Sequence, residues 1–390
     1  MVERKKIALC LEYPLALRGG VSVLVETLLA GLREHYDLIL VSPDNREELA
    51  GQPAGSFITE HVGWTPSAVS PQTARQLAQE LARRGAGLAH FHLGGNYGWG
   101  NRVPRYCPIP YLDRLGVPCC STVHLVVNPL DGYCGPQKPL WFKLAMLPLA
   151  WTGKIQQLRH VRLEIAVSQH DLQKLRRWYW PLKNRYAQMY HSRLRAGDGP
   201  KNGTAREPIV LNVGHIAWRK GQAVLAEAFA QVAPRHPEWK LWLAGDSLEQ
   251  PETDKVIAIA KAHQLTDRIV LLGPRKDALD LMRRAGIYVQ PSIHEALGLA
   301  LQEALFTGCP AIGSRAGGIP ELIDHERTGL LVEPGQPAQL AQALETLISS
   351  APLREQYGRQ GAASIVEKGM TAEQMTARHV ELYESILQKR

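Results

Sequence analysis

Long apolar runs and paired cysteines are absent from this sequence of 390 residues. No window reaches about 18 uninterrupted apolar residues, so we expect no membrane-spanning helix. The apolar stretch near the basic start is broken by Glu12 and Pro14, which argues against a secretory signal. The six cysteines form no Cys-x-x-Cys pair, so we expect reduced, mostly buried thiols rather than a zinc site or a disulfide framework. Together these absences favour a cytoplasmic protein.

Three motifs that hold nucleotides or metals are also missing. The chain has no G-x-x-x-x-G-K-[ST] loop and no G-x-G-x-x-G turn, so neither a P-loop nor the usual dinucleotide site is supported. It has no Asp-x-Asp, the arrangement that holds a nucleotide-bound metal in many single-domain sugar transferases. His90 and His92 lie on one face of a predicted strand, but two ligands without a third are weak evidence for a metal. We expect no metal and no other cofactor.

The net charge of +8 is concentrated in the first half of the chain. Residues 1–200 contain 24 basic and 15 acidic side chains, whereas residues 201–390 contain 21 and 22. Most of the excess lies between residues 101 and 195, with 15 basic and 4 acidic side chains. Two interpretations stay open: the first half meets an anionic partner, or it has an ordinary, well-solvated basic surface.

Short apolar runs alternate with amphipathic stretches along the whole chain, which predicts α/β domains with parallel sheets and helices on both faces. The first series of predicted strands lies at 6–11, 37–42, 87–93, 118–127 and 163–168. A second series lies at 207–216, 239–246, 268–273, 286–292 and 309–314. The segment before this restart is rich in Gly, Pro, Asn and charge, which is typical of a linker.

We therefore predict two Rossmann-like, doubly wound domains that face each other across a cleft. The N-terminal domain is expected over 1–195, the linker over 196–207 and the C-terminal domain over 208–370. The last helical pattern, 371–390, is expected to pack back on the N-terminal domain. Ligands of such sheets bind at the carboxyl ends of the strands.

The stretch PSIHEALGLALQEALFTGCPAIGSRAGGIPELI (291–323) places two glutamates around an apolar helix start. Glu295 precedes the predicted helix and Glu303 lies within it, about 12 Å further along an ideal helix axis. The free N–H groups around Gly298 and Leu299 suit an anion. This geometry suits a diphosphate flanked by hydroxyl-bearing groups, as in a nucleotide-sugar. The alternative is that both carboxylates form the polar face of an amphipathic helix.

Three other segments place further candidate residues near strand ends. Lys220, before Gly221, follows a strand and could reach a phosphate, or it is a solvated surface lysine. Gly19 and Gly20 open the first helix and could admit a phosphate, or they form a plain tight turn. His124 lies near the end of a predicted strand, where site residues gather. It is either a site residue or a structural histidine.

Taken in order, these segments resemble the family-4 retaining glycosyltransferases (glycosyl transferases group 1), which have the GT-B fold. The resemblance covers nearly the whole chain. It is carried by the following segments: Gly19-Gly20-Val21, STVH, IAVS, VGHIAWRKG, the stretch 291–323 and TGLLVEPG. It implies a hexosyltransferase-type enzyme that moves a sugar from a UDP- or GDP-sugar to a hydroxyl acceptor with retention of anomeric configuration.

The resemblance also implies a role for each candidate residue. Glu303 would hold the donor ribose and Glu295 the donor sugar. Lys220 would neutralise the diphosphate, while Gly298 and Leu299 would donate backbone N–H groups. It further implies catalytic roles for Lys220 and Glu295.

The same comparison implies that Gly19 and Gly20 pack against the phosphates. His124 would lie beside the sugar and the reacting centre, and it is the third residue expected to be catalytic.

Two positions depart from the family pattern. His215 stands where the family usually has an arginine that binds the diphosphate, and Arg219 is expected to compensate. MYHSRL (189–194) replaces the usual Asn-Gly-Val-Asp turn. Alternative functions therefore remain: a sugar-nucleotide epimerase, a glycosyl phosphorylase, or a catalytically degenerate glycosyltransferase that acts as a binding partner.

The first half also contains candidate acceptor and surface segments. Residues 139–151 are apolar and rich in aromatics, and residues 172–195 mix basic and aromatic side chains without an acid. This composition favours peripheral attachment to the inner face of the cell membrane and a lipid-linked or cell-surface glycan acceptor, against the alternative of a core helix and an ordinary exposed segment. The Gly-rich segment 92–102 is a candidate acceptor loop or a plain turn. No nucleic-acid module is recognisable.

Overall fold

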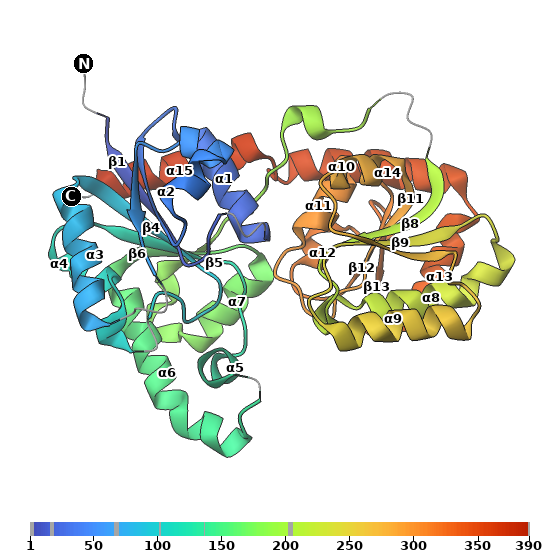
Figure 1. Cartoon of the computed structure of the whole chain (residues 1–390), viewed down its shortest axis with the longest axis horizontal. Helices are drawn as coiled ribbons and strands as arrows, with labels where there is room; N and C mark the ends of the chain where they lie inside the picture. Colours follow the sequence, from blue (N-terminus) through green and yellow to red (C-terminus); the bar gives the residue numbers. More distant parts are fainter. Residues whose placement is uncertain are drawn as a thin grey trace. The chain divides into compact units, whose positions relative to one another are not determined.

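The computed structural model describes residues 4–15, 19–65, 70–100, 103–135, 137–201 and 206–388 (Figure 1). The contacts divide the chain into two compact units. Unit 1 comprises Met1–Arg193 and Ala372–Arg390, and unit 2 comprises Leu194–Thr371. Each unit has its own parallel sheet and its own apolar core.

Unit 1 contains a seven-stranded sheet in the order β3-β2-β1-β4-β5-β6-β7, with every neighbouring pair parallel. The strands are β1 (Lys6–Leu11), β2 (Asp37–Ser42), β3 (Glu60–Gly63), β4 (Ala86–Leu93), β5 (Cys119–Val123), β6 (Val161–Ala166) and β7 (Tyr186–Gln188). The order reverses between β1 and β4, so their loops leave toward opposite faces. A ligand site is expected at such a reversal.

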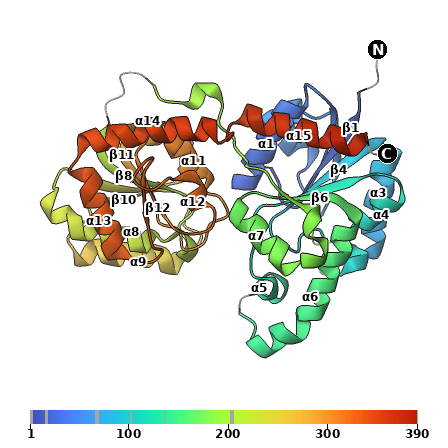
Figure 2. The ribbon, with the colours of Figure 1, turned by 180° about the vertical axis from the view of Figure 1, so that it is seen from behind.

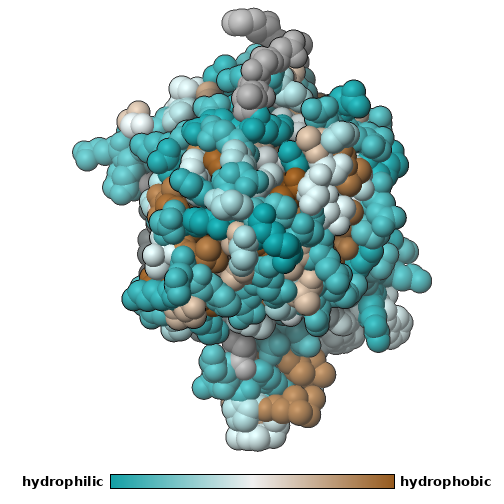
Figure 3. Space-filling model, turned by 90° about the vertical axis from the view of Figure 1, so that its right-hand side faces the viewer, coloured by the Kyte–Doolittle hydropathy of each residue, from teal (hydrophilic) through white to brown (hydrophobic). Residues whose placement is uncertain are grey.

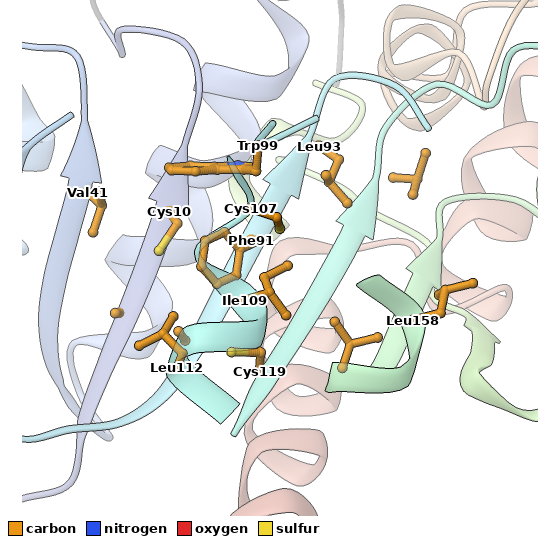
Figure 4. Close-up of a cluster of buried hydrophobic side chains, with 14 of the residues drawn as sticks. Cys10, Val41, Phe91, Leu93, Trp99, Cys107, Ile109, Leu112, Cys119 and Leu158 are labelled. Carbon is orange, nitrogen blue, oxygen red and sulfur yellow. The ribbon is translucent and has the colours of Figure 1, made fainter. Parts of the chain in front are cut away.

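Helices cover both faces of this sheet, because its central strands are buried on both sides. They are α1 (Gly20–Leu32), α2 (Arg46–Ala50), α3 (Pro71–Arg83), α4 (Ile109–Arg114), α5 (Pro129–Cys134), α6 (Leu140–His160), α7 (Gln169–Trp178) and α15 (Ala372–Leu387). Cys10, Phe91 and Cys119 point to one face, where Leu112 of α4 and Leu158 of α6 join them (Figure 4). The residues that alternate with Cys10, Phe91 and Cys119 along their strands point to the other face.

The second face of this sheet is covered by α1 and the C-terminal helix α15 (Figure 2). Ile7 and Leu9 of β1 pack there with Leu28 of α1 and with Met375 and Tyr383 of α15. The chain thus returns from unit 2 to complete the core of unit 1.

Five histidines meet on this same face. His90 and His92 project from β4, and their rings stack with centroids 4.4 Å apart. His90 Nδ1 lies 2.6 Å from the Tyr383 hydroxyl, and His92 Nδ1 lies 3.0 Å from His124 Nε2. The two other members of this histidine cluster are His191 and His379.

Unit 2 repeats the architecture with a six-stranded parallel sheet in the order β10-β9-β8-β11-β12-β13. Its strands are β8 (Glu207–Val213), β9 (Lys240–Ala244), β10 (Ile269–Gly273), β11 (Ala285–Gln290), β12 (Ala311–Ser314) and β13 (Leu330–Val332). Its helices are α8 (Gln222–Val232), α9 (Gln250–Ala262), α10 (Ala278–Arg284), α11 (Leu299–Phe306), α12 (Ile319–Leu322), α13 (Pro337–Ile348) and α14 (Ala351–Glu367). The order reverses between β8 and β11.

The predicted α/β class with doubly wound parallel sheets is confirmed. Three short strands, β3, β7 and β13, have no counterpart among the predicted strands. The strand predicted over 118–127 ends at Val123, so His124 lies directly after it. Within the segment predicted as a linker, Asp198 and Gly199 accept hydrogen bonds from the Arg283 guanidinium and belong to unit 2. Residues 202–205 lie outside the described residues.

A buried ion pair joins α6 to β6 in unit 1. Lys154 Nζ lies 2.8 Å from Glu164 Oε1, and both side chains are fully buried. Lys154 also donates to Gln157, and Ser121 donates to Glu164. The base of α6 is therefore held by charge as well as by apolar packing.

Replacing one member of this pair is expected to destabilise unit 1. Lys154→Met leaves the Glu164 carboxylate buried without its counter-charge, which costs about 3–5 kcal/mol of unfolding free energy. Urea denaturation followed by circular dichroism measures this loss. The double variant Lys154→Met/Glu164→Gln should recover much of it, because no charge is left behind. A single variant as stable as the wild type would contradict this reading of the pair.

The histidine cluster predicts a loss of stability in acid. Burial lowers the pKa of His379 to about 4, although its hydrogen bond to the Met375 carbonyl opposes the shift. Burial also lowers the pKa of His90 and His92 well below the ordinary value. Below pH about 6.5 the unfolded chain binds more protons than the folded one. Each such histidine therefore lowers the free energy of unfolding by up to about 1.4 kcal/mol for each unit by which the pH falls.

Urea midpoints compared at pH 7 and pH 5 measure this effect. The wild type should be less stable at pH 5, and His379→Gln should show a shallower decline. His263→Gln is the matched control because His263 is exposed, and it should keep the wild-type slope. Equal slopes for wild type and His379→Gln would contradict the assignment.

Candidate functional site

The carboxyl ends of β8 and β11 meet at the strand-order reversal of unit 2. The two strands are neighbours, with Ile287 opposite Val210 and Tyr288 opposite Leu211. The loop after β8 contains His215, Arg219 and Lys220, and the loop after β11 contains Glu295. Because the loops leave adjacent strands at one edge, side chains far apart in the sequence come together here.

Lys220 and Glu295 form an ion pair across these two loops. Lys220 Nζ lies 2.6 Å from Glu295 Oε2, and the side chains are 16% and 10% exposed. The Ser292 hydroxyl and the Gln290 amide donate to the same Oε2, at 3.1 and 3.2 Å. Within the described part of the chain, no donor reaches Glu295 Oε1. One carboxylate oxygen is therefore held by the protein, and the other stays available as an acceptor.

Charge keeps the Glu295 carboxyl ionised. Burial alone would raise its pKa, but the charge and hydrogen bond of Lys220, with a smaller contribution from Arg219, lower the pKa below its usual value. Glu295 is therefore an anion at neutral pH and acts as a hydrogen-bond acceptor. It does not store a proton for donation.

Two glycines set the backbone around this pair. Gly221 has a φ of 72°, and a Cβ added there would lie 2.2 Å from the Pro291 carbonyl oxygen. Gly317 has a φ of 55°, and a Cβ there would lie 1.6 Å from the carbonyl oxygen of Glu295. Only glycine fits at such contacts. The Gly-rich segment after β12 thus lies directly against the backbone that carries Glu295.

Helix α11 begins at Leu299 with Gly298 as its N-cap, and no side chain caps that end. The first helical bond runs from the Gln302 N–H to the Gly298 carbonyl, so the N–H groups before Gln302 have no partner within the helix. Glu295 lies outside the helix and Glu303 lies inside it, 4% exposed. The ideal-helix spacing of about 12 Å therefore does not describe their separation.

His215 and Arg219 lie in the loop after β8. His215 is half-buried, with Nδ1 4.0 Å from Asp246 Oδ2. The Arg219 carbonyl accepts from Ile293 and His294, which ties this loop to the one after β11. Both residues therefore share the edge of the sheet that carries the ion pair.

Sequence reasoning missed the polar residues that support these loops. Gln222 is fully buried and its amide donates to Asn212 Oδ1 and to the His215 carbonyl. Asn212 donates in turn to the Val289 carbonyl, which links β8 to β11. The only signal available in the sequence was one polar residue inside a strand, Asn212, and one at the start of a helix, Gln222.

The candidate residues of unit 1 lie at the corresponding edge of its own sheet. Gly19 is the N-cap of α1 in an extended conformation, and Gly20 is the first helical residue. No side chain caps this helix, and its first turn has no acidic residue. Its start thus presents backbone N–H groups without a competing carboxylate.

His124 is held in place by the histidine cluster. Its backbone N–H donates to the Leu93 carbonyl at 2.9 Å, and its ring stacks on His92 with centroids 5.3 Å apart. Burial lowers the pKa of His124 to about 3. The imidazole is therefore neutral at pH 7 and can offer a hydrogen bond but no charge.

Aromatic side chains of the candidate acceptor loop pack into the interior of unit 1. In the candidate acceptor loop, Tyr97 and Trp99 are buried, and the Tyr97 hydroxyl lies 3.0 Å from that of Tyr179. Residues 101 and 102 lie outside the described residues. All six cysteines are free thiols, and five of them are buried. Among the described residues, no group of three His, Cys, Asp or Glu side chains is arranged to hold a metal ion.

Comparison with known proteins places this geometry in a family. The profile of Glycosyltransferase Family 4 matches residues 18–186, and that of Glycosyl transferases group 1 matches residues 199–364. An N-acetyl-alpha-D-glucosaminyl L-malate synthase from Bacillus anthracis is 29% identical over 181 residues, which is 46% of each chain. The aligned segment thus spans less than half of that relative.

Solved structures share the fold over nearly the whole chain. A glycosyltransferase from Rickettsia africae superposes with a TM-score of 0.79 at 20% identity, covering 99% of this chain and all of the other. The Anabaena protein HepE in complex with UDP superposes with a TM-score of 0.76 at 18% identity, covering 98% and 100%. These matches, with the two profiles, confirm the predicted GT-B fold, and the chain belongs to family 4 of the glycosyltransferases.

Proposed function

We propose that this protein is a retaining glycosyltransferase that moves a sugar from a UDP- or GDP-sugar to a hydroxyl group. The observation that carries the proposal is the Lys220–Glu295 ion pair beside the uncapped start of α11. A buried cation, an ionised acceptor and free helix N–H groups suit a diphosphate attached to a sugar. HepE, whose fold is similar, has been crystallised with UDP. This supports UDP-sugars as the first donors to test.

In this proposal the cations of unit 2 balance the donor diphosphate. Lys220 is the main positive charge, Arg219 lies in the same loop, and His215 there is proposed as a further donor contact. The N–H groups at Gly298 and Leu299 add fixed positive dipoles at the helix start. Glu303 would accept hydrogen bonds from the ribose hydroxyls, and Glu295 from hydroxyls of the sugar. Gly19 and Gly20 are proposed as further phosphate contacts.

The proposed reaction breaks the bond between the anomeric carbon and the diphosphate oxygen. The acceptor oxygen bonds to the anomeric carbon on the face that the leaving group vacates, which retains the configuration. The acceptor proton passes to the leaving phosphate, so no protein base is required. Stabilising the charge on that phosphate is then the main task of Lys220 and the α11 N-terminus.

Two residues would act on the sugar in this scheme. The ionised Glu295 would orient sugar hydroxyls and stabilise positive charge developing at the anomeric carbon. His124, neutral at pH 7, would offer a hydrogen bond to the sugar. Neither residue needs to change its protonation state during transfer.

The acceptor is proposed to be a lipid-linked or cell-surface glycan precursor at the inner face of the membrane. The support is the basic excess between residues 101 and 195, which lies in unit 1 and in the first residues of unit 2. An anionic surface would concentrate a protein with this charge. Attachment would be peripheral, because no helix of the described ranges is long and apolar enough to cross a bilayer.

A donor panel tests the proposed function. UDP-, GDP- and ADP-sugars are incubated with the protein, and nucleotide release and the anomeric proton of the product are followed by NMR. We expect turnover with one UDP- or GDP-sugar and retention at the anomeric carbon. Glu303→Ala should weaken donor binding at least tenfold, because it removes the proposed ribose ligand. Glu227→Ala, in α8 of the same unit, is the matched control.

Each alternative function has its own outcome in this experiment. Epimerisation of the donor sugar without transfer would identify an epimerase, and dependence on free phosphate would identify a phosphorylase. A protein that neither binds nor turns over any donor would be a degenerate binding partner. Turnover unaffected by Glu303→Ala would contradict the proposed site.

Removal of divalent metal is expected to leave the activity unchanged. In the proposal Lys220, Arg219 and the helix N–H groups balance the charge of the diphosphate, so no metal has to bridge the phosphates. Initial rates measured with and without EDTA check this directly. A loss of rate that Mg²⁺ or Mn²⁺ restores would show that these groups do not suffice.

A further inference from the structure

The N-terminal half of α6 is apolar on the side that faces solvent. Residues Leu140–Leu149, here called the α6 tip, include Leu140, Trp141 and Leu144 with 65%, 71% and 53% of their surface exposed. Leu147 and Leu149 are exposed as well. Positions 140, 144 and 147 follow the spacing of one helix face, the pattern that normally packs into a core.

The α6 tip projects from unit 1, whereas the other half of the helix is anchored in it. Ala150, Lys154 and Leu158 are buried, and the Trp151 indole donates to the Trp178 carbonyl. Figures 1 and 2 show the N-terminal end of α6 extending away from the sheet, with only α5 beside it. In Figure 3 a hydrophobic patch covers one side of the lowest lobe, where α6 lies in Figure 1.

The exposed side of the α6 tip has no charge of its own. The one charged residue of the α6 tip is Lys143. Its side chain is 13% exposed and bonded to Asp131 of α5. Five exposed large apolar side chains within ten residues of one helix are unusual on a surface that stays in water. The interpretation of 139–151 as a core helix is therefore wrong for Leu140–Leu149.

Positive charge is supplied by segments that precede α6 or pack near it. Lys138 precedes α6, and Arg177 and Lys183 are exposed in α7 and in the short helix η4 (Trp180–Arg185), which packs against α6. The three acids of residues 129–185 are each accounted for. Asp131 pairs with Lys143, Glu164 pairs with Lys154, and Asp171 is buried. Among the described residues, Lys138, Arg177 and Lys183 form no ion pair.

We propose that the α6 tip inserts into the interface of an anionic phospholipid bilayer. Leucines and Trp141 would enter the boundary between headgroups and acyl chains, and Lys138, Arg177 and Lys183 would contact lipid phosphates. Trp180, 68% exposed beside these cations, is a second aromatic suited to that depth. Ten helical residues extend about 15 Å, half the hydrocarbon thickness, so the tip enters one leaflet only.

Charge favours a lipid surface over a second copy of this chain. Two tips packed face to face would bring the same cations together with no carboxylates to offset them. A bilayer that contains anionic lipid offers apolar chains and negative phosphates in one surface. The inference rests on the proposed peripheral location, but it is independent of the donor chemistry in unit 2.

Vesicle co-sedimentation tests the proposal. The full chain is mixed with phosphatidylcholine vesicles, with and without phosphatidylglycerol, and pelleted at low salt. The wild type should bind the anionic vesicles, and Leu140→Ser/Trp141→Ser/Leu144→Ser should bind at least tenfold more weakly. Leu115→Ser/Val366→Ser is the matched control, because these apolar residues are also exposed but lie elsewhere. It should bind like the wild type.

Two further readouts separate the possible outcomes. UDP binding by the tip variant should equal that of the wild type, whereas Lys220→Ala should lose UDP binding and still sediment with vesicles. Failure of the donor experiment thus leaves the membrane result intact. Absence of wild-type binding, or equal binding by wild type and tip variant, would overturn the proposal. So would light scattering that shows a dimer which the tip variant abolishes, because the tip would then be a contact between copies.

Discussion

The ion pair between Lys220 and Glu295 depends on one constraint, the reversal of strand order between β8 and β11. Two parallel strands that are neighbours in the sheet send their loops toward opposite faces, and the residues that begin those loops meet at the shared edge. The pair is nearly buried, and three donors converge on one carboxylate oxygen. A cation and an anion are therefore kept side by side next to a helix start that has free N–H groups.

Burying the charges of Lys220 and Glu295 costs free energy, which the surrounding residues must offset. A buried carboxylate is stable only with a counter-charge and hydrogen bonds. Gln222 and Asn212 supply the hydrogen bonds that hold the Lys220 loop, and Gly317 allows a second loop to lie against the Glu295 backbone. In unit 1 the histidine cluster plays a similar part for His124. Its imidazoles stay neutral because they are buried, and they connect β4 to the C-terminal helix.

Much of the fold was predictable from the alternation of apolar runs. The strands at Lys6–Leu11 and Asp37–Ser42 were predicted with their observed bounds, because a parallel strand buried on both faces is almost uniformly apolar. The strands β3, β7 and β13 were missed because each has only three or four residues. Glu295 was predicted to precede a helix and Glu303 to lie within it, and α11 has both residues in those places. The polar supports Asn212 and Gln222 were missed, since a single polar residue in an apolar run has no distinctive pattern.

The sequence by itself determined the α/β class, the resemblance to family-4 glycosyltransferases and the candidate residues of the donor site, because periodicity and ordered motifs are local properties of the chain. It could not decide that Lys220 bonds to Glu295, since 75 residues separate them and only the strand order brings them together. Nor could it decide which apolar segments are covered. Residues Leu140–Leu149 and Ala150–His160 are halves of one helix, yet the first half has α5 beside it and leaves five apolar side chains exposed, whereas the second half packs into the core of unit 1. Burial is a property of what surrounds a helix, and only the tertiary structure supplies those surroundings.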